Sequence, residues 1–97
     1  MAETRPNTVI PARIPFDLYA ATASHPQGAI NVGVKINVKM ISNGEGLLYA
    51  GASLLSRPTN ETGYRPIRPD ETWENDTGDA GAFIFSDQGC TINIEVA

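Results

Sequence analysis

The acidic side chains between positions 70 and 79 are the residues of this chain whose type and spacing could do chemistry. The segment reads DETWENDTGD and holds five carboxylates. Calcium takes about six to eight oxygen ligands, and Glu74, Asp76 and Asp79 offer some of them, but their spacing does not follow a known calcium loop. A carboxylate pair can also hydrolyse a glycosidic bond, yet so thin a domain leaves little room for a substrate cleft. We interpret the segment as a solvated acidic turn and leave calcium binding open.

Other residue types that support catalysis are scarce. The 97 residues include one cysteine, Cys90, and one histidine, His25. One cysteine cannot form a disulfide within the chain or a zinc site of several thiolates, and one histidine cannot form a two-histidine metal site. His25 precedes Pro26 in a turn-rich segment, so we expect it to be exposed, whereas Cys90 should be a small buried residue. The sequence predicts neither an enzyme nor a cofactor, and no catalytic or metal-binding residues.

Charge is unevenly distributed along the chain, whose net charge is −4. All seven cations precede position 70, and the residues from 70 onward carry seven acids and no cation. Nucleic-acid binding needs a concentrated basic face, so this distribution argues against it and favours self-association or docking on a mixed-charge protein. Arginine and aromatic residues dominate tight interfaces. We therefore predict an inter-subunit contact in residues 57–79, with a solvated loop as the alternative; its contact residues are Arg57, Tyr64, Arg65, Arg68 and Trp73.

The first fifteen residues contain three prolines, at positions 6, 11 and 15. Proline excludes a helix here and argues against a central strand. We expect residues 1–15 to form an extended arm beside a β-sandwich domain of residues 16–97, and a frayed terminus is the alternative. The arm should dock on a neighbouring subunit or on the shell beneath, with Arg5 also able to pair with an acid there; the expected contacts are Val9, Ile10, Arg13 and Ile14. No apolar run is long enough to span a membrane and the N-terminus does not resemble a signal peptide, so we expect a protein made and kept in the cytoplasm.

Two stretches alternate between apolar and polar residues, which predicts half-buried antiparallel strands. INVGVKINVKM (30–40) and CTINIEV (90–96) place these residues inward: Ile30, Val32, Val34, Ile36, Val38, Met40, Cys90, Ile92, Ile94 and Val96. Shorter strand candidates cover 16–23, 47–55, 72–75 and 82–86, and we find no convincing helix. The sequence predicts an all-β fold, a small antiparallel β-sandwich of about six to eight strands, either jelly-roll-like or immunoglobulin-like.

The order of motifs over residues 30–97 resembles the small β-sandwich decoration (cement) proteins of tailed-phage capsids. The motifs are INVGVKINVKM, SNGEG, LLYAG, TGYRPIRPDETWEND, AFIFS and CTINIEV. The resemblance implies a structural virion protein on the capsid surface, made in the host cytoplasm, that clamps neighbouring major capsid subunits. It implies a homo-oligomer, with a trimer favoured, and neither a nucleic-acid nor a membrane partner.

Two alternatives remain open at this point. One is a carbohydrate- or receptor-binding module, for which Tyr49, Tyr64 and Trp73 are the aromatic side chains available for stacking on a sugar. The other is a head–tail or baseplate joining protein, which the sequence does not distinguish from a decoration protein.

Overall fold

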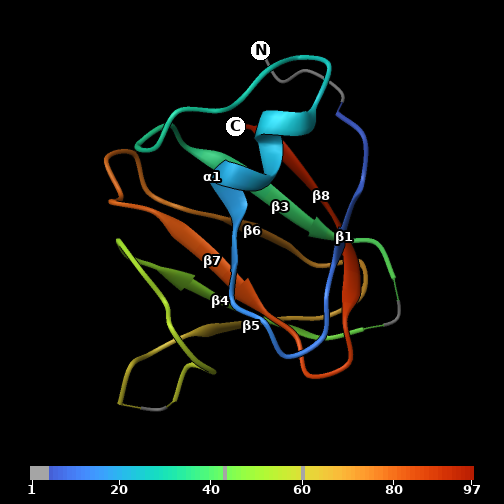
Figure 1. Ribbon diagram of the computed structural model, residues 1–97, viewed down its shortest axis with the longest axis vertical. Coiled ribbons are helices and arrows are strands. Elements are labelled where there is room, and N and C mark those ends of the chain that lie inside the picture. Colours follow the sequence, from blue (N-terminus) through green and yellow to red (C-terminus); the bar gives the residue numbers. More distant parts are fainter. Residues whose placement is uncertain (1–4, 43, 60) are drawn as a thin grey trace.

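Two four-stranded antiparallel sheets pack face to face in the computed structural model, which describes residues 5–42, 44–59 and 61–97 (Figure 1). The first sheet has the order β1 (Thr8–Ile10), β8 (Cys90–Val96), β3 (Ile36–Met40) and β6 (Thr72–Glu74). The second has the order β2 (Phe16–Asp17), β7 (Ala82–Phe85), β4 (Gly46–Ala50) and β5 (Arg65–Ile67). The predicted all-β sandwich is confirmed.

The strands pair as nested partners from the two ends of the chain toward its middle. β1 pairs with β8, β2 with β7, β3 with β6 and β4 with β5, and all of these pairs are antiparallel. The chain therefore runs as one long hairpin that is wrapped into two sheets. This nested order is that of a jelly roll, one of the two sandwich types that the sequence predicts.

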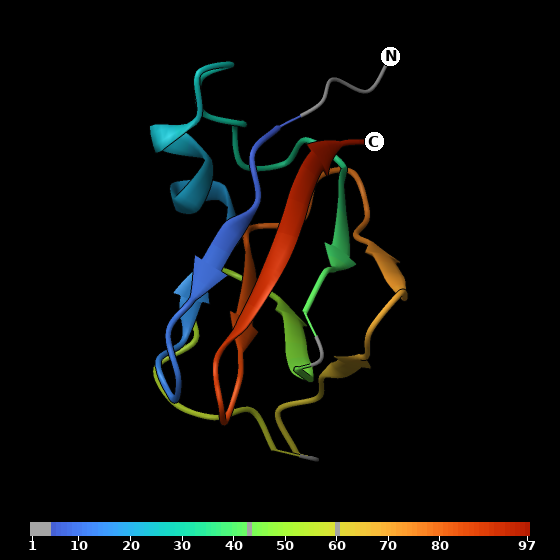
Figure 2. The same cartoon turned by 90° about the vertical axis from the view of Figure 1, so that its right-hand side faces the viewer.

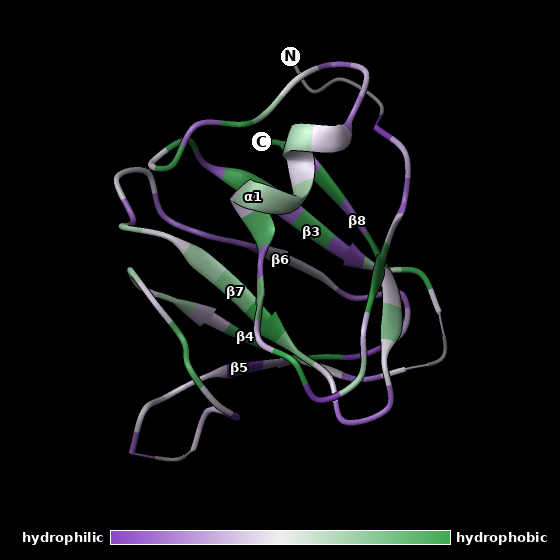
Figure 3. Ribbon diagram, in the orientation of Figure 1, coloured by the Kyte–Doolittle hydropathy of each residue, from purple (hydrophilic) through white to green (hydrophobic). Residues whose placement is uncertain are grey.

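Alternating side chains of β3 and β8 fill the space between the sheets. These inward side chains form one core cluster with Leu48, Ile67 and Ile84 of the second sheet. The inward residues of β3 and β8, each 0% exposed, are Ile36, Val38, Met40, Ile92 and Ile94. Figure 3 shows the alternation directly, because β3 changes between green and purple along its length. The predicted inward faces of these two strands are confirmed from Ile36 to Met40 and from Cys90 to Ile94.

The strand predicted over residues 30–40 begins later than expected, at Ile36. Ile30 is buried, but Val32 and Val34 are 57% and 36% exposed, so their predicted inward placement is wrong. Gly33 has a φ of 96°, in the left-handed region where a side chain is strained, and the Val34 N–H closes a turn on the Asn31 carbonyl at 3.1 Å. The turn rotates these valines toward solvent.

The strand predicted over 16–23 ends after Asp17, and a helix follows, so the expectation of no helix is wrong. α1 (Leu18–Ala21) continues into the 3₁₀ turn η1 (Thr22–Ser24). The Asp17 carboxylate accepts hydrogen bonds from the backbone N–H groups of Tyr19 and Ala20 at 3.0 and 3.2 Å, which caps the helix N-terminus. Leu18 and Tyr19 enter the core from this turn of helix.

Residues 8–10 of the expected arm belong to the sandwich itself. β1 lies at the edge of the first sheet beside β8, and Ile10 is opposite Cys90 in the register (Figure 2). Ile10 is 1% exposed and belongs to the core cluster. The prediction that Ile10 contacts a partner is therefore wrong.

The outer face of the second sheet is also apolar. Leu48 and Ile84 face the core, so their neighbours Leu47 and Phe85, which pair with each other, face outward; both are only 5% exposed. The β4–β5 connection covers this face: its Pro58 is buried, and the adjacent Arg57 forms an ion pair with Asp87, at the end of β7.

Candidate functional site

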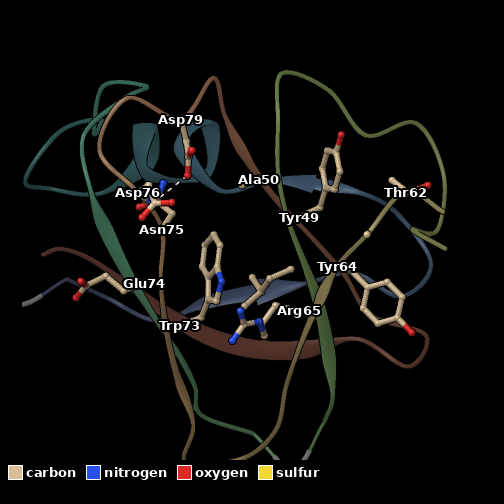
Figure 4. A pocket seen from close by; sticks show the side chains of 12 residues that line it. Tyr49, Ala50, Thr62, Tyr64, Arg65, Trp73, Glu74, Asn75, Asp76 and Asp79 are labelled. Carbon is tan, nitrogen blue, oxygen red and sulfur yellow. Dashed lines mark hydrogen bonds between the residues drawn. The ribbon is translucent and has the colours of Figure 1, made fainter. Parts of the chain in front are cut away.

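A groove of about 460 Å³ opens between β5 and β6, the edge strands of the two sheets (Figure 4). Neither strand pairs with a further strand in the described part of the chain, so the sandwich is open along this side. The residues that shape the groove come from β4, β5, β6 and the turns beside them: Leu48, Tyr49, Tyr64, Arg65, Trp73, Asp76 and Asp79. Three of these, Tyr49, Tyr64 and Trp73, are the aromatic residues predicted from the sequence as candidates for stacking on a sugar.

Trp73 is the central side chain of the groove. It lies opposite Val38, which points into the core, so the alternation of β6 directs the indole inward between the two sheets. The indole packs against the core cluster but stays partly exposed, because β6 is an edge strand and nothing described covers it on the open side.

Arg65 approaches the same groove from the opposite edge. It pairs in register with the inward residue Leu48, and Figure 4 shows its side chain beside the Trp73 indole. Within the described residues Arg65 has no ion pair, and it is exposed.

The other two arginines of the segment 57–79 pair with acids of their own chain. Arg57 lies 3.3 Å from the Asp87 carboxylate, and Arg68 lies 3.5 Å from that of Glu45. All four side chains are more than half exposed, and such pairs contribute little to stability. The Arg57–Asp87 pair joins the cationic part of the sequence to its acidic part, whereas the Arg68–Glu45 pair lies within the first part.

A tight turn carries the carboxylates at the other end of the groove. The Asp76 N–H donates to the Asp79 carboxylate at 3.0 Å, and Gly78 takes the positive φ of 90° that the turn needs. Glu74 instead forms an ion pair with Lys35 at 2.7 Å, which raises the pKa of that lysine. In the part of the chain that the structure describes, no three acids, histidines or cysteines are grouped so that they could hold a metal ion.

Asn75 anchors this turn to the core, a role that the sequence analysis missed. The side chain is 3% exposed. Its carbonyl accepts from the Ile36 N–H at 2.8 Å, and its amide donates to the Tyr19 hydroxyl at 2.7 Å. That hydroxyl in turn donates to the Val34 carbonyl at 2.6 Å.

Tyr49 and Tyr64 complete the aromatic lining. Tyr64 is 37% exposed, next to Gly63, whose φ is 84°. The Tyr49 ring lies over Gly51, where a Cβ atom would be 2.6 Å from the ring. Glycine at position 51 therefore leaves the space that the hydroxyl end of the Tyr49 ring occupies.

A buried polar cluster holds the N-terminal segment to the rest of the domain. The Arg5 guanidinium donates to the Gly28 carbonyl at 2.6 Å and lies 3.4 Å from Nδ1 of His25, while Nε2 of His25 is 3.2 Å from the Thr8 hydroxyl. Arg5 and His25 are 5% and 7% exposed, so the predictions of an exposed His25 and of an Arg5 that pairs with a partner's acid are wrong. Burial, and then the Arg5 charge, lower the pKa of His25.

The remaining predicted contacts of the N-terminal segment are exposed. Val9 is 74% and Ile14 is 53% exposed, and Arg13 is exposed in the β1–β2 loop, where its N–H donates to the Ser86 carbonyl at 2.7 Å. Val9 lies opposite Thr91 on the outer face of the first sheet. Ile41, 45% exposed, donates its N–H to the carbonyl of the same threonine at 2.9 Å.

No family model, curated protein or solved structure matches this chain. Across residues 5–42, 44–59 and 61–97, no helix has the length and apolar character needed to cross a membrane. Cys90 is buried as predicted, and burial raises the pKa of its thiol.

Proposed function

We propose that this protein is a structural virion protein, a decoration protein that clamps neighbouring major capsid subunits of a tailed phage as a homo-oligomer, with a trimer favoured. The observation that carries the proposal is a row of three branched side chains on the outer face of the first sheet, of which Val9 and Ile41 are exposed and Thr91 is half-buried. Val9, Thr91 and Ile41 occupy adjacent strands β1 and β8 and the end of β3 in one line across the sheet.

This row has the character of a binding surface. Adjacent strands are about 4.8 Å apart, so Val9 and Ile41 lie on either side of Thr91 and one partner surface can cover both. Complete burial of one valine or isoleucine side chain stabilises a complex by roughly 1.5–3 kcal/mol. A partner that covers both therefore gains about 2–4 kcal/mol, since each is already partly buried.

Two further features support the proposal. The order of motifs resembles that of decoration proteins, and the jelly roll is a fold that viral capsid proteins use, although lectins and enzymes share it. Arg13 and Ile14 are exposed in the loop between β1 and β2 and add to the surface available to a shell protein.

Binding to capsids tests the proposal. Purified protein is mixed with particles that lack it, and the bound copies are counted by quantitative mass spectrometry against the major shell protein. A copy number comparable with that of the shell protein supports decoration, whereas a few copies per particle indicate a joining protein. No binding refutes both roles.

Paired variants test the apolar row. Val9→Ser with Ile41→Ser should lower capsid binding by about tenfold or more, following the estimated loss of apolar burial. Leu55→Ser is the matched control, because Leu55 is 91% exposed in the β4–β5 connection, away from the row. Equal binding by the double variant and the control would show that another surface makes the contact.

A further inference from the structure

We propose that the groove between β5 and β6 binds a neutral saccharide, with the Trp73 indole as the stacking platform and Arg65, Asp76 and Asp79 as hydrogen-bonding groups. This is a binding activity in addition to capsid decoration, and it does not depend on that function. Four features of the groove support it: its shape, its aromatic lining, the sign of its charges and the rigidity of its rim.

The shape of the groove suits a sugar. Its volume of about 460 Å³ is within the range of small-molecule sites, roughly 300–1,000 Å³. The groove is open along one side because it lies between two edge strands, so a longer chain can pass through it without a closed pocket. A pyranose has a flat face of C–H groups that matches an aromatic ring, and hydroxyls around its edge that need polar partners.

The aromatic lining supplies the apolar contact. Trp73 projects into the groove, whereas the rings of Tyr49 and Tyr64, on the other side of it, point away from the indole, so the indole is the stacking surface (Figure 4). Large aromatic residues provide wide contact areas while losing little conformational entropy on binding. Because β6 is an edge strand, the indole is partly exposed and accessible to a ligand from the open side.

The charges favour a neutral ligand. Arg65 carries donors only, and the ionised Asp76 and Asp79 carry acceptors only. A hydroxyl both donates and accepts, so a sugar can use all three side chains. An acidic sugar or a nucleic acid would place its charge beside the two carboxylates, and a cationic ligand would place its charge beside the guanidinium next to the indole, whereas a neutral sugar avoids both contacts.

The rim is held in place before a ligand binds. Asp76 and Asp79 are joined by a hydrogen bond across their turn. Asn75, directly before Asp76, is fixed by its two buried hydrogen bonds to Ile36 and Tyr19. A preorganised rim lowers the entropy lost on binding.

The fluorescence of Trp73 tests the proposal, since it is the only tryptophan of the chain. Purified protein is titrated with the neutral trisaccharides maltotriose, mannotriose and chitotriose, and with trigalacturonate as an acidic counterpart, up to about 10 mM. We expect a saturable change with at least one neutral sugar and a dissociation constant of about 1 mM, typical of a shallow site. Absence of saturation with all three neutral sugars, or stronger binding of trigalacturonate, overturns the proposal.

Two arginine variants distinguish specific binding from a general surface effect. Arg65→Gln should weaken sugar binding by about tenfold or more. Arg68→Gln is the matched control, because Arg68 is exposed in the same segment and pairs with Glu45 outside the groove. It should leave binding within about twofold of the parent value. Equal loss in the two variants, or none in Arg65→Gln, overturns the assignment.

Discussion

Replacement of Asn75 by alanine should be among the most destabilising changes in the turns of this protein. The variant leaves the buried Ile36 N–H without its acceptor, at a cost of about 1–3 kcal/mol. The Tyr19 hydroxyl loses one donor but keeps its bond to the Val34 carbonyl, so this loss adds only about 0.5–1.5 kcal/mol. We expect a total of about 2–4 kcal/mol, a large part of the roughly 5–15 kcal/mol available to a small domain.

Urea denaturation followed by Trp73 fluorescence measures this loss, and the midpoint should fall while the slope stays unchanged. Asn31→Ala is the matched control, because Asn31 is exposed and its side chain has no hydrogen bond within the described residues. It should cost less than about 0.5 kcal/mol. A loss for Asn75→Ala as small as this control would refute the inference that these hydrogen bonds hold the turn to the core.

Three further predictions concern the core and the buried polar cluster. The pKa of His25 lies below its usual value of 6.5 through burial and then the Arg5 charge, so stability should be constant above pH 6.5 and decline as the pH falls below it, where only the unfolded chain takes up the proton. In denaturation measured across this pH range, His25→Gln should remove that decline. Ile36→Ala should cost about 2–5 kcal/mol in urea denaturation, and a loss below about 0.5 kcal/mol would mean that Ile36 is not a core residue. Gly46→Ala should lower the melting temperature, at a cost of about 1–3 kcal/mol, because its Cβ would lie 2.7 Å from Cδ1 of Ile84; an unchanged melting temperature would contradict this packing.

The sequence predicted the parts of the fold that depend on local alternation. In β8 and β3, apolar and polar residues alternate along the sequence. Because successive side chains of a strand point to opposite faces, this alternation identifies the residues that face the core. The helix at Leu18 was missed, although Asp17 is a common N-cap residue, because α1 has only four residues and so short a helix shows no helical periodicity in the sequence. Gly33, which takes a positive φ in the turn before β3, was the residue that could have indicated that the strand begins only at Ile36.

Features that join distant positions could not be predicted in this way. The cluster of Arg5 and His25 forms only because β1 is held at the edge of the first sheet, close to η1. Likewise, Trp73 was recognised as a candidate stacking residue, but its approach to Arg65 depends on β5 and β6 being the open edges of two different sheets. No local pattern carries that information.

The nested pairing of the strands has a consequence for the time at which this domain can fold. Among the strands that the structure describes, β1 has β8 as its one neighbour, and β8 leaves the ribosome after the other strands of the sandwich. Pairing between such distant segments is slow, because closing the long loop between them costs conformational entropy before any contact offsets that cost. β8 lies between β1 and β3 and pairs with both. Until it has been synthesised, Ile10 and the inward side chains of β3 are not covered by it, so the nascent chain exposes apolar surface. The sandwich is therefore complete only after β8 has left the ribosome, and any surface that spans β1, β8 and β3 exists only from that moment.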